Sequence, residues 1–351
     1  MFLIFLAAAG IFTVFFSSAY FLYRSYFARG SNFFSYSAKI AGFQEGAAAG
    51  EELLDDLLAD VMTELSITGS GGVTLKADYY RSLSCNANAS ESLEKRDVDG
   101  SRGDAAESGK LVVIVPGYGD SIKTVYAPAA DYLRHGFDVI IVYPRGIGKS
   151  GGKRCGLSYV DATDLIRWLK YISGRFEAQK IVLHGFSFGA SAVIQSVSSR
   201  AFYKARLDEY VSAVIADSAF TSMADVFSDY YKNFTKKSRF QCFFFIQLSH
   251  YMSLISFLSG CHFFENISPL KFLKRRGHLF AKSKKIKIRV IPMLFLHGKN
   301  DTICRVWMAE KLFASSHTAE NRNRIVLFDD AVHGGSYYIN PKKYMETVLS
   351  L

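Results

Sequence analysis

One serine in this chain stands where a buried strand is expected to end and a helix to begin. Residues 181–183 are Ile-Val-Leu, an apolar and β-branched run suited to a strand buried on both faces, and residues 190–199 are small and compatible with a helix. Gly185 and Gly189 stand two residues before and after Ser187. Because bulky side chains there would collide with neighbouring backbone, the spacing predicts a serine lifted onto a tight, strained turn.

The Gly-x-Ser-x-Gly pattern is equally typical of a plain strand-to-helix turn, so its meaning depends on the rest of the chain. Strands and helices alternate from residue 111 onward. We expect strands at 111–115, 137–143, 181–184, 211–216, 290–296 and 324–328, and helices at 121–135, 159–173, 190–199, 305–315 and 341–349. This alternation predicts an α/β fold, with a mostly parallel sheet, helices on both faces, and a ligand site beyond the carboxyl ends of the strands.

Two further residues follow the last two expected strands. They are Asp301 and His333, and the chain order of serine, acid and histidine is the one found with a nucleophile elbow. We therefore expect His333 to accept the proton of Ser187, and Asp301 to orient the imidazole and stabilise its cation. Taken singly, a loop aspartate is usually a turn former or solvated, and a loop histidine more often lies at the surface than in a catalytic site. Asp217, at the end of an earlier strand, is the reserve acid.

An acyl-transfer site also needs N–H donors where negative charge develops on the substrate. The sequence offers the amide of Phe188, directly after the serine, and the amide of Tyr118, after the first strong strand. Gly117 and Gly119 would also suit any tight strand-to-helix turn, so the assignment of Tyr118 depends on the rest of the site.

From about residue 67 to the C-terminus the chain resembles an α/β-hydrolase of the membrane-anchored bacterial serine-hydrolase type. The segments that carry the resemblance are Val-Pro-Gly-Tyr-Gly-Asp at 115–120, Pro-Arg-Gly-Ile-Gly-Lys-Ser at 144–150, His-Gly-Phe-Ser-Phe-Gly at 184–189, Ala-Asp-Ser-Ala-Phe-Thr-Ser at 216–222, Leu-His-Gly-Lys-Asn-Asp at 296–301 and His-Gly at 333–334. The resemblance implies an esterase, lipase, thioesterase or peptidase-like hydrolase that uses Ser187, Asp301 and His333 without metal or cofactor. Relatives usually have His-Gly at 116–117 and a smaller or less aromatic residue at 188.

The N-terminal residues 2–23 carry no charge and are rich in Phe, Leu, Ile and Ala. About 20 such residues span a bilayer as a helix, so we expect residues 1–24 to be a single-pass transmembrane anchor or signal-anchor. A signal peptide cleaved near 17–19 is the alternative. Basic residues follow the segment and favour a cytosolic domain, whereas three Asn-x-Ser/Thr sequons favour the opposite side, at Asn88, Asn233 and Asn266.

Three further regions complete the expected organisation. Residues 25–66 are interpreted as a linker that contains an amphipathic helix around 51–58, and residues 67–351 as the hydrolase domain. The polar stretch 84–110 is typical of a loop. Within the domain, alternation stops at about 221–289, where this fold commonly carries a helical cap.

The cap segment is both aromatic and basic. The formal net charge of +10 is concentrated between 236 and 289, where Glu265 is the single acid. We expect the aromatic residues to line an acyl pocket and the basic residues to meet anionic lipid heads, or else to be cap core and solvated face. The aromatic residues are Phe240, Phe243, Phe244, Phe245, Tyr251, Phe257, Phe263 and Phe264. Binding to nucleic acid is disfavoured by the anchor and the triad.

The five cysteines are scattered, without spacing typical of a metal site, and one disulfide, between Cys242 and Cys261, is left open. Together these patterns predict a membrane-localised serine hydrolase for ester or thioester bonds of small or lipid-like acyl substrates. A peptidase-like hydrolase, of the aminopeptidase or prolyl-oligopeptidase kind, is the alternative. A catalytically inactive binding protein on the same fold is a third hypothesis, from a different class.

Overall fold

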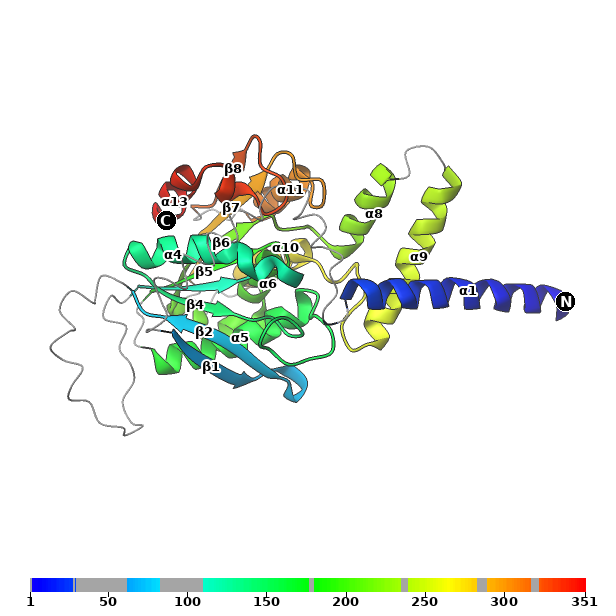
Figure 1. Cartoon of the computed structure of the whole chain (residues 1–351), viewed down its shortest axis with the longest axis horizontal. Coiled ribbons are helices and arrows are strands. Elements are labelled where there is room, and N and C mark those ends of the chain that lie inside the picture. Colours follow the sequence, from blue (N-terminus) through cyan, green and yellow to red (C-terminus); the bar gives the residue numbers. More distant parts are fainter. Residues whose placement is uncertain are drawn as a thin grey trace.

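Eight strands form one sheet in the computed structural model, which describes residues 2–27, 29, 62–82, 110–176, 180–234, 239–282, 289–316 and 322–351 (Figure 1). The strands are β1 (Met62–Thr68), β2 (Thr74–Tyr80), β3 (Lys110–Val115), β4 (Asp138–Val142), β5 (Lys180–Phe186), β6 (Val211–Asp217), β7 (Met293–Gly298) and β8 (Arg324–Phe328). Their order across the sheet is β1-β2-β4-β3-β5-β6-β7-β8. The pairs β1–β2 and β2–β4 are antiparallel and the others are parallel, so the predicted mostly parallel sheet is confirmed.

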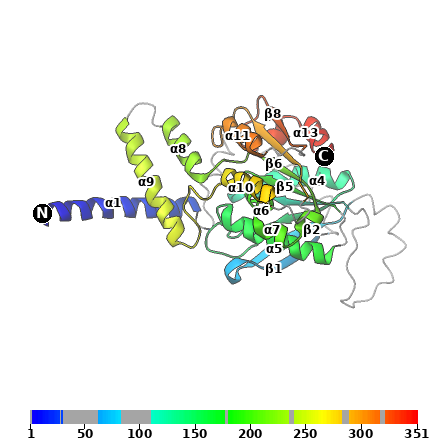
Figure 2. The ribbon, with the colours of Figure 1, turned by 180° about the vertical axis from the view of Figure 1, so that it is seen from behind.

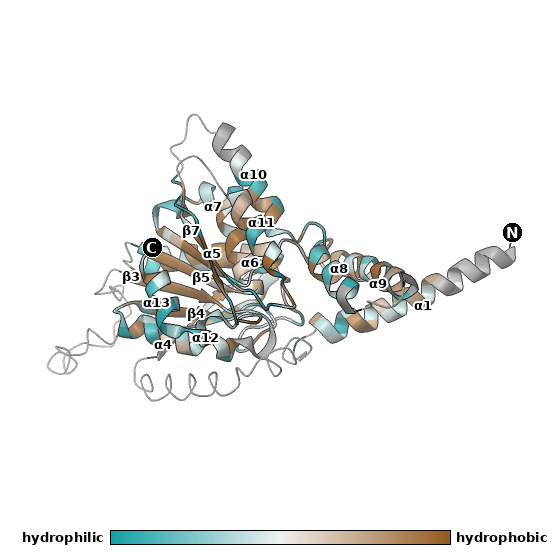
Figure 3. Ribbon diagram, turned by 90° about the horizontal axis from the view of Figure 1, so that it is seen from above, coloured by the Kyte–Doolittle hydropathy of each residue, from teal (hydrophilic) through white to brown (hydrophobic). Residues whose placement is uncertain are grey.

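Helices cover both faces of the sheet, and Figure 3 shows the apolar strands between them. One face packs against α4 (Tyr126–Arg134), α12 (Ser336–Ile339) and α13 (Pro341–Leu349). The other face packs against α5 (Tyr159–Arg175), α6 (Phe188–Val197), α7 (Arg200–Lys204), α10 (Pro269–Lys282) and α11 (Val306–Ser316), several of which are visible in Figure 2. Neighbouring residues of β3 point to opposite faces of the sheet, since Val112 lies in the apolar cluster on one face and Val113 in the cluster on the other. Continuous apolar runs are what a strand covered on both faces requires.

The helix expected at 121–135 is divided in two. A 3-10 helix, η3 (Gly119–Val125), precedes α4, which begins only at Tyr126. Pro128 explains the division, because proline has no N–H to donate and is tolerated only in the first turn of a helix. Starting α4 at Tyr126 places Pro128 in that first turn.

The N-terminal edge of the sheet differs from the expected linker. Residues 62–66, assigned to the linker, form most of β1, which pairs in register with β2 across a turn. Gly71 and Gly72 have φ of 69° and 76° in this turn, which glycine adopts without strain. The amphipathic helix expected at 51–58 lies outside the described residues, and so does nearly all of the loop expected at 84–110.

The first helix, α1 (Phe2–Phe27), packs across α9 (Arg239–Leu258) and ends at the α/β domain (Figures 1 and 2). Four apolar side chains near its C-terminal end are at most 8 % exposed: Ala19, Tyr23, Tyr26 and Phe27. Within the described part of the chain, no helix combines the length and the apolar character needed to cross a membrane. The predicted single-pass membrane anchor and membrane localisation are therefore wrong. Within the range predicted as the anchor, Ala19 and Tyr23 are buried against the rest of the protein.

The insertion expected at 221–289 contains α8 (Met223–Phe234), α9 and α10. Helices α8 and α9 pack against each other and lie beside α1, away from the sheet, whereas α10 returns to pack on α6 and α11. Helices α8 and α9 together with the segment 259–268 are called the cap. Phe264 is buried in the cap, whereas Phe243 and Phe257 are 60 % and 47 % exposed. The aromatic residues are thus divided between cap core and surface.

Arg276 and Cys261 in this region also differ from what the sequence predicts. Arg276 belongs to the basic run expected to meet lipid, but its guanidinium is buried and donates to the carbonyl oxygen of Ile291 (3.2 Å). Cys261 is a free cysteine, so no disulfide joins it to Cys242.

Candidate active site

The backbone at Ser187 is held in a conformation that few residues other than glycine adopt, with φ 53° and ψ −113°. A Cβ atom at Gly185 would lie 2.5 Å from the Cα of Ala190, and one at Gly189 would lie 1.9 Å from the carbonyl oxygen of Val115. The turn is also fixed by the Ser187 N–H, which donates to the carbonyl oxygen of Asp217 (2.8 Å). Both flanking glycines are therefore needed for β5 and α6 to meet at this angle.

The side chains of Ser187, His333 and Asp301 form an unbroken chain of hydrogen bonds. Ser187 Oγ lies 2.8 Å from His333 Nε2, and His333 Nδ1 lies 2.7 Å from Asp301 Oδ2. The three residues follow β5, β8 and β7, so the carboxyl ends of three parallel strands bring them together. The arrangement is that of a nucleophile, a general base and a group that orients the base.

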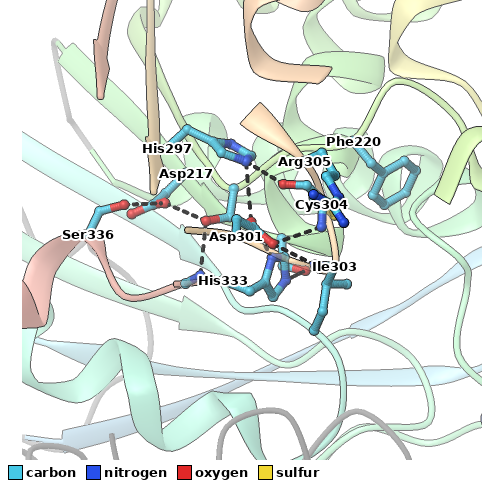
Figure 4. Close-up of polar contacts among 12 residues, drawn as sticks. Asp217, Phe220, His297, Asp301, Ile303, Cys304, Arg305, His333 and Ser336 are labelled. Carbon is cyan, nitrogen blue, oxygen red and sulfur yellow. Dashed lines mark hydrogen bonds and ion pairs between the residues drawn. The ribbon is translucent and has the colours of Figure 1, made fainter. Parts of the chain in front are cut away.

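Asp301 is surrounded by donors on both carboxylate oxygens. Oδ1 accepts the N–H groups of Ile303 and Cys304, each at 2.8 Å, and Oδ2 lies 3.2 Å from His297 Nε2 as well as next to His333 (Figure 4). Burial of this carboxyl alone would raise its pKa. The charge of His333 and the hydrogen bonds from both histidines outweigh burial, and the pKa of Asp301 lies well below its ordinary range. Asp301 is thus an anion at neutral pH.

His297 was missed by sequence reasoning. Its Nε2 lies 2.6 Å from the carbonyl oxygen of Cys304 and also faces Asp301 Oδ2. Both neighbours are acceptors, so Nε2 carries the proton and donates. The side chain is fully buried and fixes the turn that presents Asp301. The available signal was spacing: a histidine at the end of a buried strand, four residues before the acid.

The pKa of His333 is set by opposing effects. Burial lowers it, but the negative charge of Asp301, the hydrogen bond to that carboxylate and the charge of Asp217 raise it, and the net shift is above the ordinary value of 6.5. A base with a raised pKa is a stronger proton acceptor, provided that it is neutral when the reaction begins.

Asp217, the reserve acid, does not hydrogen-bond to His333. Its Oδ1 accepts the hydroxyls of Ser218 (2.9 Å) and Ser336 (3.1 Å), and its Oδ2 accepts the hydroxyl of Tyr344 (2.9 Å). The Ser218 oxygen accepts the N–H of Gly334 at 3.0 Å, directly beside the histidine. Asp217 therefore holds the loop that carries His333, and it acts through Ser218, a second residue that sequence reasoning missed.

A buried hydrogen-bond network continues behind Asp217. The Tyr344 hydroxyl donates to Asp217 and lies 2.9 Å from His184 Nε2, while His184 Nδ1 lies 3.1 Å from the hydroxyl of Tyr132. Burial lowers the pKa of His184 to about 3, so the ring is neutral. These contacts tie α4, β5, β6 and α13 together below the site.

The two residues proposed as oxyanion donors lie together. Tyr118 follows β3 and caps η3, Phe188 is the first residue of α6, and their ring centroids are 5.9 Å apart. The first amides of a helix point out of its N-terminus, which favours nearby negative charge. Phe220 packs edge-on against Phe188 with centroids 5.3 Å apart, so the surroundings of Ser187 are aromatic.

No group of three or more His, Cys, Asp or Glu side chains within the described ranges is placed to hold a metal ion. The site described above consists of a serine, a histidine, a carboxylate and aromatic rings.

The sheet order, the strained serine between two glycines and the placement of the site at the strand ends are those of the α/β-hydrolase fold. The predicted resemblance to this class is thereby confirmed in fold, and the comparisons with known proteins agree. A family model described as "Serine aminopeptidase, S33" matches residues 106–237, a range that contains Tyr118, Ser187 and Phe188. No curated protein sequence matches the chain.

Solved structures share the fold at low sequence identity. The Pyrococcus furiosus esterase Pf2001 superposes with a TM-score of 0.55 at 20 % identity, over 84 % of this chain and 91 % of that one. An Exiguobacterium antarcticum esterase has a TM-score of 0.51 at 18 % identity, over 81 % and 97 %. A Mycobacterium tuberculosis puromycin-hydrolyzing peptidase has a TM-score of 0.51 at 16 % identity, over 82 % of this chain and 38 % of that one.

Proposed function

We propose that this protein is a serine hydrolase that cleaves carboxylic ester or thioester bonds of apolar acyl substrates. The single observation that carries the proposal is the hydrogen-bonded chain from Ser187 through His333 to Asp301, with contacts of 2.8 and 2.7 Å. Two of the structural neighbours are esterases, which agrees with this proposal.

In the first half of the reaction, His333 Nε2 takes the proton of Ser187 Oγ as this oxygen attacks the carbonyl carbon. The carbonyl oxygen becomes negative and is stabilised by the amides of Tyr118 and Phe188. The tetrahedral intermediate then collapses: the bond to the leaving oxygen or sulfur breaks, and His333 returns the proton to that atom. Ser187 is left acylated, and Asp301 stabilises the imidazolium throughout.

In the second half, water takes the place of the leaving group. His333 removes a proton from this water, the hydroxide attacks the acyl carbon, and the carboxylic acid leaves as His333 returns the proton to Ser187 Oγ. Each proton therefore passes through one nitrogen, Nε2, while Nδ1 stays bonded to Asp301. This division of roles matches the two contacts of the imidazole.

The surroundings of Ser187 support an apolar acyl group. Tyr118, Phe188 and Phe220 lie within one connected apolar cluster that continues into the cap. Such a surface favours hydrocarbon over charged groups because burying apolar area removes it from water. A lipid-like ester fits this description as well as a small one does.

A peptidase-like activity is the second candidate, favoured by the description of the matched family model. An aminopeptidase needs a carboxylate for the α-ammonium group of its substrate. The carboxylates that border His333 already accept protein donors, four at Asp301 (Ile303, Cys304, His297 and His333) and three at Asp217 (Ser218, Ser336 and Tyr344). This occupancy favours the ester hypothesis.

One series of assays distinguishes the ester-hydrolase hypothesis from the peptidase hypothesis. We expect p-nitrophenyl esters to be hydrolysed and aminoacyl or peptidyl p-nitroanilides to be hydrolysed far more slowly, with Ser187→Ala as the inactive control. Faster turnover of the anilides would replace the ester hypothesis by the peptidase one. A third hypothesis, an inactive binding protein, predicts that neither substrate turns over and that a fluorophosphonate probe does not label the folded protein.

A further inference from the structure

The C-terminal end of α1 reaches the aromatic surroundings of the candidate site. Phe27, the last residue of α1, is fully buried. Its ring centroid lies 6.4 Å from that of Tyr118, 6.3 Å from Phe227 in the cap and 6.2 Å from Phe264 in the cap. All three contacts are edge-on, the geometry that aromatic pairs prefer. One side chain of α1 thus joins the oxyanion turn to the cap.

Backbone hydrogen bonds hold this end of α1 in place. The carbonyl oxygen of Phe27 accepts the N–H of Cys155 (3.2 Å), and the N–H of Arg29 donates to the carbonyl oxygen of Lys153 (3.0 Å). The guanidinium of Arg29 also donates to the carbonyl oxygen of Gly148 (3.0 Å). The helix end is therefore bound to the loop after β4, and the position of Phe27 is set by the α/β domain itself.

Two aromatic contacts lead from the ring of Phe27 to the residue beside the nucleophile. Tyr118, which this ring touches, lies 5.9 Å from Phe188, the residue directly after the nucleophile. Tyr26 extends the same surface by stacking on Phe227 with centroids 6.2 Å apart. The apolar surface next to Ser187 is thus built by three separate segments: the oxyanion turn, the cap and the end of α1.

We propose that Phe27 determines substrate specificity by closing this apolar surface on the α1 side and so limiting the length of the acyl chain. The inference rests on the proposed function and deepens it. The ring of Phe27 is fully buried and packs edge-on against Tyr118. Replacing it by a small side chain leaves a cavity that the surrounding core fills only in part. A longer hydrocarbon chain occupies such a space, and each extra methylene buried favours the longer substrate.

The test compares three variants with the natural chain: Phe27→Ala, Phe27→Leu and Phe21→Ala. Phe21 is the matched control because it is a phenylalanine of the same helix that is 70 % exposed. The measured quantity is the rate at which Ser187 reacts with a long-chain alkyl fluorophosphonate, divided by the rate with a short-chain one. Thermal unfolding of each variant is followed in parallel, and Phe27→Leu keeps an apolar side chain in case the alanine variant does not fold.

In Phe27→Ala the long-to-short ratio is expected to rise by about 10-fold or more, the scale on which one methylene in an apolar pocket discriminates. Phe27→Leu should show a smaller rise and Phe21→Ala none. A merely structural role slows both probes together and leaves the ratio unchanged. An unchanged ratio in Phe27→Leu, with both probes still labelling Ser187, would overturn the role of Phe27 and leave the proposed function standing. Absence of labelling in the folded natural chain would overturn both.

Discussion

The strand-end site and the assembly of α1 with the cap differ in how their residues come together. Ser187 directly follows β5, and Asp301 and His333 lie in the loops that follow β7 and β8 of the same sheet, so the sheet sets their positions. Phe27, Tyr118 and Phe264 come from three separate segments, and their rings meet by side-chain packing. Chemistry built on a regular frame can be inferred from local patterns, whereas a surface built by packing of distant segments cannot.

The largest expected effect is the loss of ester hydrolysis when the strand-end site is mutated. Ser187→Ala or His333→Ala should lower kcat for ester hydrolysis by about 10⁶-fold, because nucleophile and base act as a unit. Ser173→Ala is the matched control, since this hydroxyl donates to the carbonyl oxygen of Lys170 in its own helix, away from the strand-end site. Steady-state kinetics with a p-nitrophenyl ester measures the change. Residual activity within 10-fold of the natural chain would place the chemistry elsewhere.

The next effect distinguishes the two buried acids at the site. Asp301→Asn should lower kcat by about 10⁴-fold, because an amide does not hold the imidazole in the required tautomer. Asp217→Asn keeps the contact between His333 and Asp301 and should mainly lower the free energy of unfolding, by about 1–3 kcal/mol, since three hydroxyl donors lose a charged acceptor. Chemical denaturation and kcat are measured for both variants. The reverse ranking of the two kcat values would make Asp217 the triad acid.

The pH dependence of kcat/KM tests the electrostatic interaction between Asp301 and His333. The neutral form of His333 is the base and its pKa is raised above 6.5, so kcat/KM should increase as the pH rises through a value above 6.5. Asp301→Asn removes the charge that raises this pKa while burial remains, so the midpoint of the residual activity should move to lower pH. A profile that does not shift in this variant would separate Asp301 from His333.

The same shifts give a stability prediction with a definite sign. The pKa of Asp301 is lowered in the folded chain, so its stabilising contribution is present above the unfolded pKa and is lost as the pH falls through the folded one. The pKa of His333 is raised, so its contribution is complete below the unfolded pKa and is lost as the pH rises through the folded one. Denaturation at several pH values, compared between the natural chain and His333→Ala, measures the second contribution.

The smallest expected effects are changes in the free energy of unfolding when either of two glycines is replaced by alanine. Gly189→Ala should lower the free energy of unfolding by about 3 kcal/mol, because its Cβ would lie 1.9 Å from the carbonyl oxygen of Val115. Gly174→Ala, in the last turn of α5 with no atom within 4 Å of the new Cβ, should raise it by at most about 1 kcal/mol. Urea denaturation measures both. Equal effects would show that the elbow tolerates a side chain.

Much of the sheet and of the strand-end site could be predicted, because the sequence patterns that indicate them are local. The ranges 324–328 and 341–349 agree with β8 and α13 at both ends, and the contact of Ser187 with His333 follows from residues at strand ends. Their catalytic roles stay predictions. His297 and Ser218 escaped notice because their importance lies in which acceptor or amide they meet in space.

The errors lie where one pattern has two physical solutions. The uncharged segment 2–23 could bury its side chains in lipid or against other helices, and Ala19 and Tyr23 of this segment are buried within the protein. β1 was assigned to a linker because its pairing partner lies across a glycine turn, and pairing is not visible in a single segment. In both cases the deciding contact is made with a distant part of the chain.

The central claim is that Ser187 becomes acylated, and a rapid-quench experiment with a p-nitrophenyl ester tests it most directly. The expected result is a burst of nitrophenolate approaching one equivalent per chain. Peptide mass spectrometry of the quenched protein should then place the acyl group on Ser187, and the adduct should be missing in Ser187→Ala. An acyl group found on another residue, or equal turnover by Ser187→Ala, would contradict the account.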